Sequence, residues 1–92
     1  MYDMMETVYT ALTALPKTYT IQNGTSTIRI VYKTIHNVNP NLNGNMLDIE
    51  QCLKKNNIKY ERKVIRFFSE YPSFLIYDKD ENIGIVTFNF GL

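Results

Sequence analysis

Apolar residues recur at helical spacing in two segments of the chain. In the first, apolar side chains three or four residues apart predict a helix that ends before Pro16. Asp3 and Glu6 stand three residues apart at its start, as in a capping box. A second stripe predicts a helix that begins at Met46, with Asn45 as its N-cap. The stripes consist of Met5, Val8, Tyr9, Leu12 and Leu15 in the first helix and Met46, Ile49, Cys52 and Leu53 in the second.

A β-hairpin is predicted between the two helices. Asn23-Gly24 suits a two-residue type I′ turn, because both positions of that turn need positive φ. This turn would set Tyr19 opposite Ile28 on the neighbouring strand. Apolar and charged residues alternate along the second strand, so one face of the hairpin is expected to be apolar and the other basic or mixed.

An asparagine-rich segment follows the hairpin. From His36 to Asn45 asparagine recurs at every second position, and we expect a loop because asparagine accepts turn conformations. Its amide groups donate and accept hydrogen bonds without charge, which makes the loop a candidate recognition surface. A general bias toward asparagine in the chain is the alternative explanation. The candidate binding residues of the loop are Asn39, Asn41 and Asn43.

Residues 58–68 fit two kinds of secondary structure. Their β-branched and aromatic residues favour a strand, and we prefer a strand because the preceding Asn56-Asn57 suits a left-handed helix end. The spacing of the apolar residues also fits a helix, and that alternative stays open. Further on, residues 71–73 predict a turn, and strands at residues 74–77 and 83–90 flank a charged hairpin loop.

These elements together predict an α+β fold in the order α-β-β-α-β-β-β. Two helices packed on one face of a mainly antiparallel sheet of about five strands would bury both apolar stripes. The 92 residues suffice for one domain, residues 1–92, without a linker or repeat. We expect the last strand to lie at a sheet edge, where an uncovered edge can pair with a second copy and form a homodimer.

Composition indicates a folded chain in a reducing compartment. Hydrophobic residues make up 45% and charged residues 21% of the chain, as in ordinary globular domains. Cys52 has no second cysteine with which to form a disulfide, and no export signal or membrane-spanning apolar run is recognisable. We therefore expect a soluble protein of the cytoplasm, or of the host cytoplasm if the chain is viral.

Residue types that carry catalysis and metal binding are scarce. Cys52 and His36 are the single cysteine and histidine, too few for a zinc site or for a catalytic set with an orienting partner. Asp78 begins an alternation like that of a calcium loop, but Ile83 stands where such a loop needs glycine. No glycine-rich phosphate loop occurs. We therefore expect no enzyme activity, no cofactor and no metal.

A basic segment is the main candidate for binding. Residues 54–66 hold six of the ten basic side chains, although the net charge of the chain is only +1. Cations contact phosphates and aromatic rings stack on bases, so nucleic-acid binding is one interpretation. A solvated face balanced by the acidic C-terminal third is the alternative. The candidate binding residues are Lys54, Lys55, Lys59, Tyr60, Arg62, Lys63 and Arg66.

The scarcity of reactive groups predicts that the chain acts by binding. A protein-binding module is the preferred interpretation. Small size and a high asparagine content are also found in accessory proteins of phages and mobile elements, many of which inhibit a host or defence protein. This is an association based on composition, not on a motif. A nucleic-acid-binding module that uses residues 54–66 is the first alternative, and a virion or other structural subunit is the second.

Overall fold

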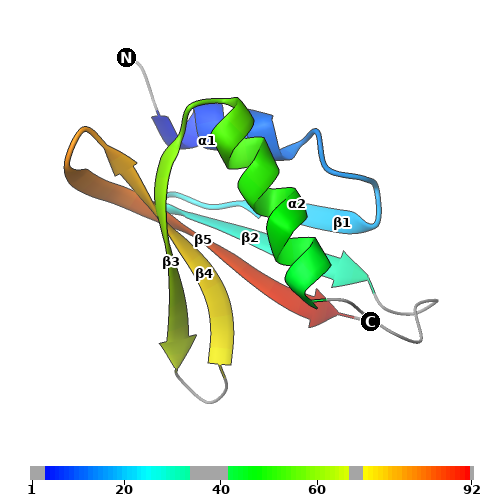
Figure 1. The fold of residues 1–92 in the computed structure, drawn as a ribbon. Helices are drawn as coiled ribbons and strands as arrows, with labels where there is room; N and C mark the ends of the chain where they lie inside the picture. The colour runs from blue at the N-terminus through cyan, green and yellow to red at the C-terminus, as the bar shows by residue number, and fades with distance from the viewer. Residues whose placement is uncertain (1–3, 34–41, 67–69, 92) are drawn as a thin grey trace.

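A computed structural model describes residues 4–33, 42–66 and 70–91 of the chain, and for 65–66 and 70–71 the backbone only. Two helices and five strands follow one another in the predicted order, which confirms the α+β fold (Figure 1). Helix α1 covers Met4–Leu12, and helix α2 covers Leu42–Lys55. The strands are β1 (Tyr19–Asn23), β2 (Thr27–Lys33), β3 (Lys59–Arg66), β4 (Glu70–Asp78) and β5 (Glu81–Gly91).

The five strands form one sheet in the order β1-β2-β5-β4-β3. Neighbouring strands run antiparallel except β2 and β5, which run parallel. The last strand, β5, is therefore central and paired on both sides, so the prediction that it lies at a sheet edge is wrong. A homodimer through an edge strand stays a prediction. Parallel neighbours need a long crossover connection, and here α2, β3 and β4 lie between β2 and β5 in the chain.

Both helices pack on the same face of the sheet and enclose one hydrophobic core (Figure 1). Alternate side chains of β2, β4 and β5 point to this face, because successive residues of a strand point to opposite faces. Two residues of the predicted stripes, Tyr9 and Cys52, are only half-buried. The core consists of Met5, Val8, Ala11, Leu12, Leu15, Tyr19, Ile28, Ile30, Met46, Ile49, Leu53, Ile58, Phe74, Ile76, Val86 and Phe88.

The hairpin of β1 and β2 turns later than predicted. Tyr19 pairs with Tyr32, so the predicted type I′ turn at residues 23–24 is wrong. The carbonyl oxygen of Ser26 accepts a hydrogen bond from the amide of Ile85 at 3.0 Å, so a contact with the central strand helps to position this loop. Because the partner of Tyr19 shifts by an even number of residues, the apolar residues keep their predicted face.

Helix α2 begins four residues earlier than predicted, at Leu42. Asn45 is not its N-cap but a buried residue within the helix. The hydroxyl of Tyr19 lies 3.0 Å from Oδ1 of Asn45 and 2.9 Å from Oδ2 of Asp48. Tyr19 thus ties the first turns of α2 to β1, and this tertiary contact outweighs the weak helix propensity of an asparagine-rich sequence.

The hydrogen bonds of the Tyr19 hydroxyl are expected to make the protein less stable as the pH rises into the alkaline range. Burial raises the pKa of Tyr19 above its ordinary value, and the nearby Asp48 carboxylate raises it further. The unfolded chain therefore loses this proton above about pH 10 while the folded chain keeps it, and the free energy of unfolding should fall by up to about 1.4 kcal/mol per pH unit. Urea unfolding from neutral to strongly alkaline pH should show a shallower fall for Tyr19→Phe. An equal fall in both proteins would contradict this role of Tyr19.

Strands β3 and β4 extend past the other strands as a two-stranded ribbon (Figure 1). Residues 59–66 are a strand, so the preferred interpretation is confirmed over the helical one. Along β4, β5 pairs only as far as Ser73, whereas β3 pairs as far as Glu70. The predicted turn at residues 71–73 is therefore wrong, because these residues belong to β4. Proline is tolerated in this part of β4, since the strand has no second neighbour there.

The hairpin of β4 and β5 has a shorter loop than predicted. Asp78 pairs with Glu81, so two residues form the turn, and Lys79 adopts a positive φ of 57°. The pairing of β4 with β5 shifts register between Ile76 and Tyr77. The side-chain amide of Asn82 donates hydrogen bonds to the backbone carbonyls of Ile76 and Gly84, each at 3.0 Å. It thereby satisfies acceptors beside the register shift.

Candidate interaction surface

The predicted basic segment is divided between the end of α2 and strand β3. Lys54 and Lys55 are exposed in the last turn of α2, where positive charge interacts favourably with the helix dipole. Asn57, with φ of 57°, ends the helix in the predicted left-handed conformation. The chain then enters β3, where successive charged side chains alternate between two faces. The five cations whose side chains the structure describes (Lys54, Lys55, Lys59, Arg62 and Lys63) therefore do not form one continuous patch.

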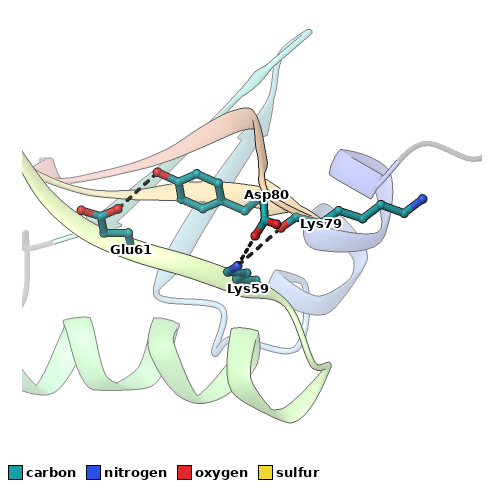
Figure 2. Close-up of polar contacts among 5 residues, drawn as sticks. Lys59, Glu61, Lys79 and Asp80 are labelled. Carbon is teal, nitrogen blue, oxygen red and sulfur yellow. Dashed lines mark hydrogen bonds and ion pairs between the residues drawn. The ribbon is translucent and has the colours of Figure 1, made fainter.

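On the sheet face away from the helices, Lys59 and Glu61 contact residues of the neighbouring hairpin (Figure 2). Nζ of Lys59 lies 3.0 Å from Oδ1 of Asp80 and 3.5 Å from the carbonyl oxygen of Lys79. The hydroxyl of Tyr77 donates to Oε2 of Glu61 at 3.2 Å. The side chain of Asp80 is 97% exposed, so the ion pair contributes at most about 1 kcal/mol to stability. These residues surround an open hollow rather than an enclosed pocket.

On the helix-facing side of β3, Tyr60 and Arg62 both reach Glu50 of α2. The hydroxyl of Tyr60 donates to Oε1 of Glu50 at 3.1 Å, and Nη1 of Arg62 lies 3.8 Å from Oε2. Partial burial, together with this hydrogen bond, raises the pKa of Tyr60. The ring of Tyr60 packs edge-on against Phe74, with 5.6 Å between the ring centroids. Tyr60 is thus held against the core and does not lie open as a stacking platform.

Lys63 differs from the other charged residues near the middle of β3. Among the side chains that the structure describes, no carboxylate pairs with it. Its neighbour Val64 points to the opposite face and is 51% exposed. Arg66 ends the strand with its backbone paired to Glu70. At Lys63 and Val64, the outer edge of β3 therefore carries a charged side chain on one face and an apolar side chain on the other.

The remaining candidates do not join this surface within the described residues. Asn43 is exposed on the first turn of α2, whereas Asn39 and Asn41 lie outside the described residues. Burial, with a smaller effect of a nearby carboxylate, raises the pKa of the Cys52 thiol. His36 also lies outside the described residues. In the described part of the chain, no three His, Cys, Asp or Glu side chains are grouped to hold a metal.

The edge position of β3 was not recognised from the sequence, although a signal for it exists. The strand carries charges on both faces, at Lys59, Glu61 and Lys63 on one and at Arg62 on the other. A strand buried between two neighbours rarely has that pattern, whereas charged side chains are common on edge strands, where they oppose unwanted pairing. Alternating charge on both faces would have predicted an edge.

Comparisons with known proteins give no relative from which a function can be transferred. No protein-family model, no curated protein and no solved structure matches this chain. Over the described residues, neither helix combines the length and apolar character that crossing a lipid bilayer requires. The function must therefore be inferred from the geometry and chemistry of the surface itself.

Proposed function

We propose that this chain is a protein-binding module without catalytic activity, and that the outer edge of β3 is its contact surface. One observation carries the proposal: β3 is an eight-residue strand with a neighbour on one side only in the described sheet. An edge strand leaves alternate backbone N–H and C=O groups unpaired, and an extended segment of another protein can satisfy them by adding a strand. An inhibitor of a host or defence protein, encoded by a phage or mobile element, would act by such contact.

The distribution of charge favours a protein partner over a nucleic acid. Lys59 is paired with Asp80. Glu61 lies between Lys59 and Lys63 on the same face, so no continuous row of unpaired cations follows this face of the strand. Tyr60 packs against the core instead of presenting its face to a base. Nucleic-acid binders concentrate unpaired cations along a surface that follows the phosphates. A net charge of +1 does not supply such an excess.

Photo-crosslinking from two exposed apolar positions tests the proposal. One variant carries p-benzoylphenylalanine in place of Val64 on β3, which is 51% exposed, and the control carries it in place of Leu47 on α2, which is 56% exposed. In a lysate of the native host cells, we expect a discrete protein adduct from position 64 and little from position 47. The adduct should persist at about 0.5 M salt, where phosphate contacts are largely lost.

Three results would contradict a protein-binding edge. Adducts of equal strength at both positions would show that no particular surface is recognised. Adducts that disappear after nuclease treatment would assign the chain to the nucleic-acid alternative. A ladder made only of copies of the chain itself would assign it to the structural alternative, because assembly beyond a dimer needs repeated contacts between copies.

A further inference from the structure

The outer edge of β3 is basic on both faces. Lys59 and Lys63 lie on the face away from the helices and Arg62 on the helix-facing side, while Glu61 is the single acidic residue of the strand. A strand added to β3 places side chains beside both faces. We propose that the occupant of this edge is an extended acidic segment of a partner protein, joined to β3 through the backbone. This proposal specifies the partner of the protein-binding function above and rests on it.

A second copy of β3 matches the charges of this edge less completely than an acidic segment does. In an antiparallel dimer the twofold axis is perpendicular to the sheet, so residues of the same face lie opposite each other. An axis through Lys63 sets that residue against its own copy, and an axis through Glu61 sets Lys59 against Lys63. An axis through Arg62 sets Arg62 against its own copy but Glu61 against Lys63. Like charges directly opposite one another destabilise strand pairing, whereas opposite charges stabilise it. No register of a second β3 places carboxylates opposite both Arg62 and Lys63, because Glu61 is the single acidic residue of the strand. An acidic segment can do so, and β3 therefore favours it over a second copy.

The ion pairs within the chain leave this attraction in place. Arg62 stays 53% exposed although it lies 3.8 Å from Glu50, a distance longer than a close ion pair. Lys63 is exposed and has no acidic partner among the described side chains. Residues opposite one another on neighbouring strands have Cβ atoms about 4.5–5.5 Å apart, close enough for a carboxylate to reach either cation. An added strand would then pair charges on both faces at once.

The order of side chains along β3 predicts the pattern of the partner. Acidic residues belong opposite Arg62 and Lys63, and an uncharged residue belongs opposite Glu61. An apolar residue belongs opposite Val64, because that side chain is half-exposed and would be covered by it. Tyr60 would also be flanked by an apolar residue. Read from its own N-terminus, an antiparallel partner with these features has the core sequence Val-Glu-Glu-Thr-Val-Glu.

Binding of this synthetic peptide to the full chain tests the proposal. With a fluorescent label on the peptide, anisotropy should show saturable binding that Lys63→Glu weakens by about tenfold or more. Lys33→Glu is the matched control, because it makes the same charge change at an exposed position on β2, which β5 and β4 separate from β3 in the sheet. We expect it to weaken binding by no more than about twofold. Circular dichroism should show that both variants stay folded.

A second peptide separates strand addition from simple charge attraction. It has the same sequence with alternate backbone nitrogens methylated, so it keeps its charge but loses the donors of the ladder, and it should not bind. Equal weakening by the two substitutions, or binding of the methylated peptide, would overturn the proposal. Tighter binding of mixed-sequence RNA or DNA, weakened by Lys63→Glu, would assign the edge to nucleic acid instead.

The two experiments fail in distinguishable ways. If the peptide does not bind but position 64 forms the protein adduct, the chain binds proteins and the acidic strand is refuted. If the adduct is also missing, the protein-binding function is refuted with it.

Discussion

Replacing Phe88 by alanine is expected to lower the free energy of unfolding by about 3–5 kcal/mol. Phe88 is completely buried on the central strand β5 and belongs to the hydrophobic core. Its ring lies 6.4 Å from that of Tyr19 and 5.3 Å from that of Phe90, between centroids. Strands on both sides of β5 prevent the structure from closing the cavity. Because a domain of this kind has about 5–15 kcal/mol in total, chemical denaturation should find the variant close to unfolding.

Phe90→Ala is the matched control for this substitution. Phe90 lies two residues further along β5 on the same face, but it is 37% exposed. Less apolar surface is lost from the interior, and solvent can fill part of the space, so we expect a loss below about 2 kcal/mol. Equal losses for the two variants would mean that the interior is not centred on β5.

The order of elements and the core face could be predicted because both are local properties of the sequence. Apolar residues at helical spacing place Met5, Val8 and Leu12 on one side of α1, and alternation places Ile28 and Ile30 on one side of β2. Although the predicted turn of the β1–β2 hairpin is wrong, the predicted apolar residues still lie on the core face. An even shift in register changes the partners of a strand but not its face.

The order of strands in the sheet could not be predicted in the same way, because it depends on contacts between distant segments. From Ile83 to Phe90, β5 carries no charged residue on either face, which suits a strand paired on both sides. β3 is charged on both faces, which suits an edge. Comparing the two strands would have placed them correctly, whereas reading each strand alone did not.

The sequence alone located part of the candidate surface. Charge clustering located the basic segment, and its preferred strand conformation is confirmed. The partners of its cations could not be foreseen, because Asp80 meets Lys59 only through the register of three strands, and Glu50 meets Arg62 only through the placement of α2. The early start of α2 was missed for a similar reason, since Tyr19 stabilises that turn from another element.

Gly84→Ala is expected to lower the free energy of unfolding by about 1–3 kcal/mol, although alanine is the better residue for most strands. Gly84 lies where Met5 of α1 and Ser26 of the β1–β2 loop approach β5. An added Cβ would lie 2.6 Å from Sδ of Met5 and 2.8 Å from the carbonyl oxygen of Ser26. The methionine side chain can move, because thioether chains are flexible. The carbonyl is held by its hydrogen bond from the amide of Ile85 at 3.0 Å, so the loop itself must shift.

Gly91→Ala separates this backbone conflict from a general effect of glycine replacement. At the end of β5, an added Cβ would come within 2.5 Å of Cγ1 of Val31, a side-chain atom on the sheet face that no helix covers. Such a side chain can turn away at a cost of about 0.5–1.5 kcal/mol, and no backbone bond is lost. Thermal or urea unfolding should therefore rank Gly84→Ala below Gly91→Ala in stability. The reverse ranking would mean that the carbonyl of Ser26 is not fixed against β5, and that the parallel pairing of β2 with β5 tolerates a displaced loop.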